Sequence, residues 1–194
     1  MRVVYLKAIV AVIFLATWAY ARADIQAGID ALKNGDYAIA EKEFRPLAES
    51  GDASAQYQLG VMYDYGLGVS QNDLLALKWY RKAGVQGIEK AQFRLGAMYD
   101  SGQGAPQSFK TALSWYRKAA EQGNADAQNN LGVMYLRGQG VRADRVQAYM
   151  WFCLAAAAGN EVAARNKSSL ELEMTPLQME MAQELVRGWS SKQK

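Results

Sequence analysis

The chain has 194 residues, of which 51% are hydrophobic and 21% charged, so it is long and apolar enough for a folded domain and does not have the composition of a disordered protein. Histidine is absent and Cys153 is the only cysteine, which excludes the commonest general base, most zinc sites and any intrachain disulfide. The net charge of +3 comes from Arg2, Lys7 and Arg22, because no acidic residue precedes Asp24. Without these three, 19 basic residues face 19 acidic ones, and we expect no nucleic-acid binding.

Residues 1–23 have the pattern of a secretory signal peptide. A basic start is followed by uncharged residues 8–21, and Ala21-Arg22-Ala23 fits the small-x-small cleavage site. Ala19-Tyr20-Ala21 offers an alternative cut two residues earlier. The 14 uncharged residues between Lys7 and Arg22 are fewer than the roughly 20 that a spanning helix needs. We therefore predict a periplasmic or secreted protein with no stable membrane span after cleavage, and an uncleaved membrane anchor is the second interpretation.

Residues 24–51 are predicted to form two amino-terminal capping helices. In the first, Ile25, Ile29 and Leu32 share one helical face before an Asn-Gly pair ends the helix. The second helix runs from Asp36 to Gly51. These helices precede a repeating region and are expected to cover its first unit.

From residue 52 onward the sequence repeats every 36 residues. The recurring set is Ala55, Leu59, Gly60, Met62 and Tyr63, then Ala91, Leu95, Gly96, Met98 and Tyr99, then Ala127, Leu131, Gly132, Met134 and Tyr135. A fixed period of this size is typical of a solenoid, whose units bury their apolar faces only against their neighbours. We predict an all-α fold, an α/α superhelical solenoid of three helix-turn-helix repeats at 52–87, 88–123 and 124–159.

Helix boundaries within the repeats follow from capping residues that keep the same period. The predicted N-caps are Asp36, Asn72, Ser108 and Asp144, and the predicted helix-ending glycines are Gly51, Gly87, Gly123 and Gly159. Each repeat therefore has a helix A, at about 53–65, 90–101 and 125–137, and a helix B that begins after the N-cap. Gly60, Gly96 and Gly132 lie inside helix A, where glycine is disfavoured, and they predict close approach of a neighbouring helix.

Residues 161–189 are predicted to form carboxy-terminal capping helices. Thr175 and Gln178 form a capping box around Pro176. Leu177, Met181, Leu185 and Trp189 are spaced by four residues and are expected to be the buried stripe that closes the stack. The tail at 190–194 is expected to be disordered.

The stretch LGVMYDYGLGVSQNDLLALKWYRKA and its two later copies resemble the Sel-one-like repeat family, which is related to the tetratricopeptide repeats. The resemblance covers residues 36–160, and the last unit with its closing helix looks like the ending of bacterial secreted members. It implies a superhelix that binds proteins or peptides, often as an adaptor in the cell envelope. Members with paired cysteines have been described as penicillin-binding or weakly β-lactamase-like, but this chain lacks those cysteines and that activity is not implied.

The in-phase residues are predicted to be scaffold. Trp79, Trp115 and Trp151 recur on the helix B stripe and are expected in the core. The recurring Gln56, Gln92 and Gln128 are expected to satisfy backbone groups between repeats. No catalytic constellation, cofactor motif or metal-ligand cluster is found in the sequence, so we predict a protein that is not an enzyme and needs no cofactor or metal.

Binding residues are expected on the opposite face of helix A, where the copies differ. The candidate groove residues are Tyr57, Val61 and Asp64, then Phe93, Ala97 and Asp100, then Asn129, Val133 and Leu136. Aromatic and acidic residues in such a groove favour an extended peptide with apolar and basic side chains. A plain solvated face is the alternative interpretation of the same residues.

The predicted function is therefore a non-enzymatic periplasmic or secreted scaffold that binds a protein or peptide in the concave helix A groove. Two alternatives remain open at this point: a hydrolase acting on cell wall or β-lactam substrates, and a membrane-tethered envelope assembly factor that keeps its amino-terminal segment. The sequence identifies neither the partner nor the oligomeric state.

Overall fold

A computed structural model describes residues 25–192 of the chain, with side chains up to Trp189. Residues 25–34 are helical. The helices that follow are α2 (Tyr37–Ser50), α3 (Ala53–Tyr65), α4 (Asp73–Val85), α5 (Glu89–Ser101), α6 (Phe109–Glu121), α7 (Ala125–Arg137), α8 (Arg145–Ala157), α9 (Glu161–Glu171) and α10 (Pro176–Lys192). The described part contains no strand, which confirms the all-α prediction. The predicted signal peptide, residues 1–23, lies outside the described residues.

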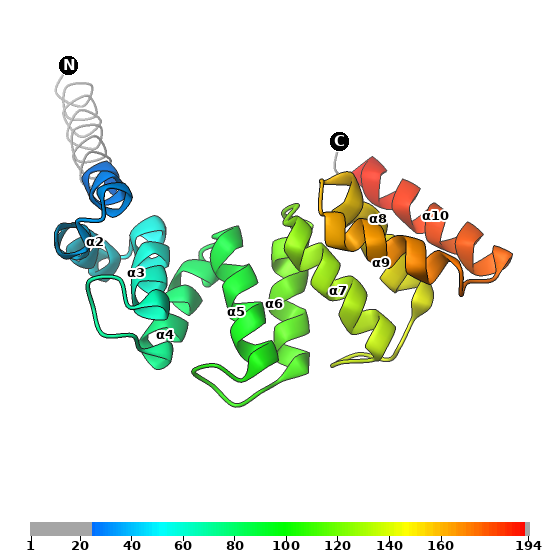
Figure 1. The fold of residues 1–194 in the computed structure, drawn as a ribbon, viewed down its shortest axis with the longest axis horizontal. Helices are drawn as coiled ribbons and strands as arrows, with labels where there is room; N and C mark the ends of the chain where they lie inside the picture. The colour runs from blue at the N-terminus through cyan, green and yellow to red at the C-terminus, as the bar shows by residue number, and fades with distance from the viewer. Residues whose placement is uncertain (1–24, 193–194) are drawn as a thin grey trace, which may run out of the picture. The chain divides into compact units, whose positions relative to one another are not determined.

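The chain divides into two compact units, described here separately. The N-terminal unit ends at Gln86 and contains α2, α3 and α4, and the C-terminal unit begins at Gly87 and contains α5 to α10. Helix A and helix B of each repeat pack against each other, as α3 with α4, α5 with α6 and α7 with α8 (Figure 1). None of the described helices is both long and apolar enough to cross a membrane.

The predicted caps are present at the start of helix B. The Asn72 side chain accepts a hydrogen bond from the Leu75 amide, and Ser108 and Asp144 make equivalent bonds in the later repeats. Asp36 is an exception, because its side chain accepts no capping bond and its backbone (φ −82°, ψ 61°) is not extended like that of the other three. The predicted helix-ending glycines all have positive φ, between 90° and 109°.

The glycines inside helix A accommodate an aromatic ring from helix B. A Cβ atom built on Gly96 would lie 2.4 Å from Cδ1 of Tyr116, and one on Gly132 would lie 2.4 Å from Cε1 of Phe152. Gly60 stands in the same relation to Tyr80. These rings are among the most deeply buried side chains. The predicted close approach is therefore confirmed: in each repeat the ring from helix B packs directly against the glycine of helix A.

The tryptophans are only partly as predicted. Trp79 and Trp151 are buried, whereas Trp115 is half-buried, with the Lys118 ammonium 4.6 Å from its ring centroid. The buried face of α6 centres on Ala112, Tyr116, Ala119 and Ala120, and Trp115 lies at the edge of that face. The residue that follows the tryptophan, Tyr80, Tyr116 or Phe152, is therefore buried in all three repeats, whereas the tryptophan itself is not.

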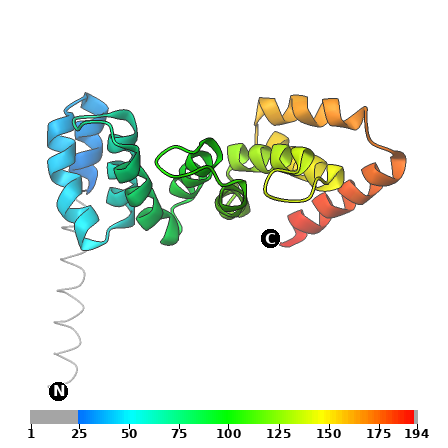
Figure 2. The same ribbon diagram turned by 90° about the horizontal axis from the view of Figure 1, so that it is seen from below.

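The carboxy-terminal cap differs from its prediction. Helices α9 and α10 both pack on α8 and meet at the connection near residue 173, as Figure 2 shows. Of the four residues predicted to close the stack, Trp189 does so, with its ring centroid 4.9 Å from that of Trp151 on α8. Leu177, Met181 and Leu185 are exposed, and Ala182 is buried instead. The stripe prediction was wrong for these three residues, because the buried face of α10 centres on Ala182. The disordered tail predicted at 190–194 was wrong for residues 190–192, because α10 continues to Lys192, and residues 193–194 lie outside the described residues.

Candidate peptide-binding groove

In the C-terminal unit, helices α5 and α7 flank a polar hollow of about 340 Å³. Ala97 and Asp100 come from α5, Val133 and Arg137 come from α7, and Tyr116 of α6 lies between them. The remaining lining residues are Ser101, Gln107, Phe109, Asn130, Met134 and Gln139. Residues three or four positions apart lie on the same face of a helix. This spacing brings Asp100 and Ser101 to the face of Ala97 on α5, and Arg137 to the face of Val133 on α7. We call this hollow the α5–α7 groove.

An aromatic pair lies at the α5–α7 groove: Tyr116 lines it, and Phe93 lies beside it, one helical turn before Ala97 on α5. The Phe93 and Tyr116 rings lie 5.9 Å apart between centroids, tilted by 43°. Phe93 is half-buried, so part of its ring remains accessible on the same helix that carries Ala97 and Asp100. The ring can contribute apolar contact area to a ligand without being part of the sealed core.

Asp100 and Arg137 are the two charged residues that line the α5–α7 groove. Asp100 is half-buried, and that burial raises the pKa of its carboxyl while the nearby Arg137 opposes part of the rise. The Asn130 side chain hydrogen-bonds the Tyr116 hydroxyl, whose pKa is raised by burial and by the Asp100 charge. Within the described residues, the Asp100 carboxylate accepts no hydrogen bond. A partly desolvated carboxylate of this kind favours a ligand that brings its own charged donor.

The equivalent face in the N-terminal unit is arranged differently. Tyr57, Val61 and Asp64 are half-buried on α3, and the Tyr57 ring lies 5.9 Å from that of Tyr80. The Tyr80 hydroxyl donates to Oδ2 of Asp64 at 3.0 Å. Burial and the Asp64 charge raise the pKa of Tyr80. The aromatic pair is thus repeated, but here the carboxylate is used by an intrachain hydrogen bond.

The third set of predicted residues, Asn129, Val133 and Leu136, does not line one common groove. Asn129 is 9% exposed, and its Oδ1 accepts a hydrogen bond of 2.9 Å from Asn166 of α9. Leu136 is exposed and lines a separate hollow near the start of α8. The structure therefore brings Ala97, Asp100 and Val133 together, with Phe93 beside them, and ties Asn129 to the carboxy-terminal cap instead. That a partner binds any of the nine residues stays a prediction.

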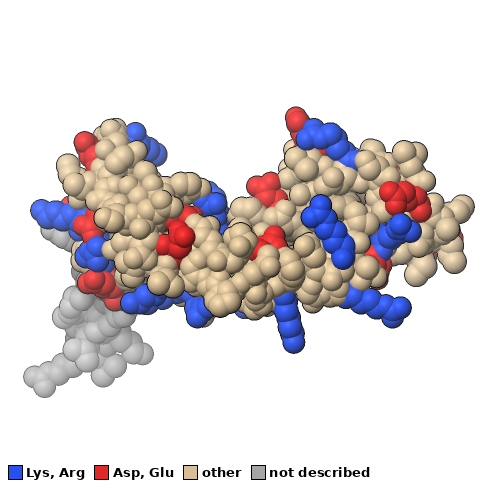
Figure 3. All heavy atoms as spheres, turned by 60° about the horizontal axis from the view of Figure 1, so that its bottom comes forward, with Lys and Arg blue, Asp and Glu red and all other residues tan. Residues whose placement is uncertain are grey.

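The described residues show neither a charged stripe on the face of the C-terminal unit in Figure 3 nor a group of side chains that could hold a metal ion. On the face shown in Figure 3, basic and acidic side chains of the C-terminal unit are interspersed, with no continuous stripe of one sign. Among the described residues, no group of three or more Cys, Asp or Glu side chains is placed to hold a metal ion.

The family model for the Sel1 repeat matches residues 53–87, 89–124 and 125–160, more than half of the chain. The chain belongs to the Sel1 repeat family. These matches lie within one residue of the expected repeats at 52–87, 88–123 and 124–159. Sel1 repeat proteins generally mediate protein–protein interaction and generally act as non-catalytic scaffolds.

Two solved Sel1-type structures resemble this one. A Sel1 repeat protein from Oxalobacter formigenes is 36% identical, with a TM-score of 0.71, over 74% of this chain and 59% of its own length. A protective antigen of uropathogenic Escherichia coli strains, which displays an SLR fold, is 29% identical, with a TM-score of 0.62, over 89% of this chain and 46% of its own. This Sel1 repeat protein thus spans about half the length of both. No curated protein matches the chain.

Of the residues that line the α5–α7 groove, only Ala97, Asp100 and Val133 were predicted as site residues, and Tyr116, Asn130 and Arg137 are among those that were missed. Tyr116 recurs in phase as Tyr80 and Phe152, which by the same reasoning makes it scaffold, and the structure both buries it and places it in the groove lining. Asn130 and Arg137 carried a usable signal, because their equivalents in the earlier copies are different residues: Gln58 and Arg94 for Asn130, and Tyr65 and Ser101 for Arg137. Variation between copies, applied to the whole exposed arc of helix A, would have included them.

Proposed function

We propose that this protein is an exported, non-enzymatic scaffold that binds a protein or peptide segment in the α5–α7 groove. The family supports the general activity, and the signal-peptide pattern at residues 1–23 supports export to the periplasm or the medium. The ligand we propose is an extended segment that presents a lysine or arginine beside an apolar side chain.

One observation carries the choice of ligand. The Asp100 carboxylate is half-buried, accepts no hydrogen bond within the described residues, and lies next to Ala97 and Val133. A basic side chain would supply charge-assisted hydrogen bonds to this carboxylate, and the neighbouring apolar surface would contact the stem of that side chain. Phe93 would then seat the adjacent apolar residue of the ligand.

Two groove variants test the proposal. Asp100→Asn keeps the shape of the side chain but removes its charge, and Phe93→Ala removes the accessible ring. Each should weaken binding of an apolar–basic peptide at least about tenfold, as expected for loss of a charge-assisted bond or an aromatic anchor. Fluorescence anisotropy with labelled peptides of apolar–basic and apolar–acidic sequence measures this directly.

Ser114→Ala is the matched control, because Ser114 is an exposed residue of α6 that does not line the groove. It should bind the basic peptide like the wild type. Equal affinity for basic and acidic peptides, or unchanged binding by both groove variants while circular dichroism remains helical, would show that the groove is not the binding site.

Export is tested separately by intact-mass measurement of the protein recovered from the periplasm or medium. Cleavage after Ala23 predicts a chain that starts at Asp24, and the alternative cut predicts one that starts at Arg22. A mass that includes Met1 would instead support the membrane-tethered alternative.

A further inference from the structure

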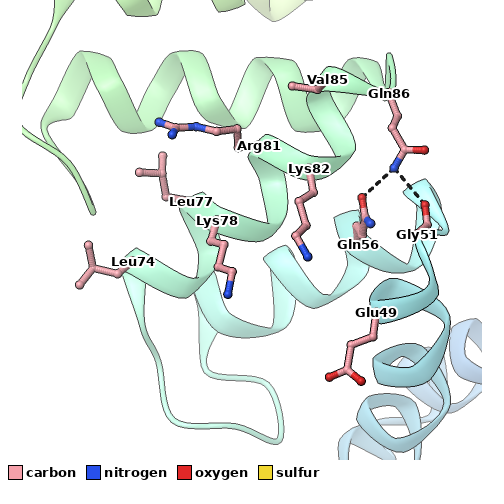
Figure 4. A pocket seen from close by; sticks show the side chains of 10 residues that line it. All are labelled: Glu49, Gly51, Gln56, Leu74, Leu77, Lys78, Arg81, Lys82, Val85 and Gln86. Atoms are coloured by element: carbon pink, nitrogen blue, oxygen red, sulfur yellow. Dashed lines mark hydrogen bonds between the residues drawn. The ribbon is translucent and has the colours of Figure 1, made fainter.

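A second concave surface lies on the N-terminal unit, along α4 and the end of α2. This α4 hollow has a volume of about 720 Å³, and Leu74, Leu77, Lys78, Arg81, Lys82, Val85 and Gln86 of α4 and its end supply most of its lining (Figure 4). Leu74 and Val85 are 70% and 71% exposed, which is unusual for aliphatic side chains that border a cavity. A pocket of this volume is large enough to receive several side chains of a partner.

The repeat pattern shows that the scaffold does not require these residues. One repeat later, the position of Leu74 is Lys110, that of Lys78 is Ser114, and that of Val85 is Glu121. The second repeat therefore folds with polar or charged residues where the first has exposed aliphatic residues and a lysine. Exposed apolar positions that the fold does not need are typical of interaction surfaces.

The charge of the α4 hollow is positive. Lys78 and Lys82 extend from α4 toward the end of α2, where Glu49 is the only acidic lining residue (Figure 4). Lys82 also lies 4.3 Å from the centroid of the Trp79 ring, a cation–π contact that holds it in place. An occupant should therefore be both acidic and apolar. Residues 1–23 do not qualify, because they contain three basic residues and no acidic one.

The exposed face of α10 has the matching chemistry. Leu177, Met181 and Leu185 are 65%, 48% and 36% exposed and follow one another at four-residue spacing. Glu180 and Glu184 flank this stripe at the adjoining helical positions and are exposed. Helix α10 packs on α8 through Ala182 and Trp189. Glu184 and Leu185 border a hollow that Met150 and Trp151 of α8 also line, and all five residues of the acidic and apolar face remain exposed.

We infer that the α4 hollow binds the α10 face of a second copy of this chain. The two surfaces are different patches, so the contact is heterologous: each copy would offer its α4 hollow to one neighbour and its α10 face to another. Such a contact forms a ring where the rotation closes and an open chain where it does not. The association should strengthen with protein concentration and weaken with salt, because charge pairs across a solvated contact are screened.

Charge reversal tests this inference independently of the groove. Lys78→Glu/Lys82→Glu makes the hollow acidic, and Glu180→Lys/Glu184→Lys makes the α10 face basic. Sedimentation velocity of the wild type, up to about 1 mM, should show concentration-dependent association. Each double variant alone should be monomeric, and an equimolar mixture of the two should associate, because each then meets a complementary surface.

Two further variants serve as controls for the charge-reversal experiment. Lys78→Glu alone reverses one charge without disturbing the Lys82–Trp79 contact, and it should already weaken association. Lys118→Glu changes the residue of the second repeat that corresponds to Lys82, and it should leave association unchanged. A wild type that stays monomeric, or a mixture of the reversed variants that does not associate, would overturn the inference. So would binding of an acidic peptide or an anionic vesicle without any self-association.

Discussion

At the residue scale, glutamine pairs connect successive helix pairs. Gln56 donates to the Ala48 carbonyl at 3.0 Å and Gln128 donates to the Ala120 carbonyl at 3.1 Å, as predicted for these positions. A second glutamine, at the end of helix B, completes the contact: Gln86 Nε2 donates to Gln56 Oε1 at 2.8 Å and to the Gly51 carbonyl at 3.0 Å. Gln122 repeats both bonds, to Gln92 and to Gly87, with the same distances.

The third repeat lacks this second glutamine. The position after Gln86 and Gln122 in the 36-residue period is Ala158, and within the described structure Oε1 of Gln128 is buried without a hydrogen-bond partner. The backbone of Ala158 (φ −84°, ψ 7°) matches that of Gln86 (φ −80°, ψ 2°), so a side chain introduced there would point in the same direction. The missing donor is therefore a local defect that one substitution can repair.

Ala158→Gln should stabilise the protein by about 1 kcal/mol, because it gives a buried unsatisfied acceptor a donor. Thermal or urea unfolding followed by circular dichroism measures the gain. Ala157→Gln is the control at an exposed neighbouring position and should change stability by less than about 0.5 kcal/mol. Equal effects of the two substitutions would mean that the glutamine pair contributes nothing specific.

Gly132→Ala should destabilise the protein by about 1–3 kcal/mol, because its new Cβ would overlap the buried Phe152 ring. Phe152→Leu should relieve part of this overlap. The double variant should then be more stable than the sum of the two single effects predicts. Strict additivity in urea unfolding would contradict the glycine-to-ring packing described for helix A and helix B.

At the element scale, α10 shows which structural features a periodic sequence pattern predicts and which it does not. The four-residue spacing correctly indicated a helix, but it could not decide which of two apolar faces contacts α8. Ala182, the residue that is fully buried, gives little signal in a sequence because alanine is common on any helix face. The partner surface on α8, including Trp151, makes that decision through a contact remote in sequence.

Trp189→Ala should therefore lower stability by more than about 1 kcal/mol, through loss of buried area and of the ring contact with Trp151. Leu177→Ala, on the exposed face, should change it by less than about 0.5 kcal/mol. Both are measured by denaturant unfolding at low protein concentration. A larger effect at Leu177 than at Trp189 would contradict the packing of α10 on α8 described here.

The groove helices predict a pH effect at Asp100. Because burial raises its pKa in the folded state, ionised Asp100 costs stability at neutral pH, and that cost disappears below about pH 4, where the carboxyl is protonated in both states. Asp100→Asn should thus be more stable than the wild type at neutral pH, and the difference should vanish in acid. Denaturant titrations at a series of pH values measure the difference, and a neutral-pH loss of stability would contradict the assigned environment.

At the scale of the whole molecule, the 36-residue period predicts the fold almost completely. In-phase alanines, leucines and glycines define the helix pairs, and in-phase caps define where most of them begin and end. The site is less predictable, because it is made by residues that depart from the period. Asn129 shows the difficulty: its helix position matches Tyr57 and Phe93, yet a contact from α9 removes it from the groove.

The most direct test of the central claim is site-specific photocrosslinking of the exported protein in its own cell envelope. A photoreactive residue at Ala97 or Val133 lies in the α5–α7 groove, and one at Ser114 lies on the outside of α6. Mass spectrometry of the crosslinked peptides should identify a partner segment with basic and apolar residues from the two groove positions, and Asp100→Asn should reduce its yield. Crosslinks of equal yield from Ser114, or none from either groove position, would contradict the proposed function.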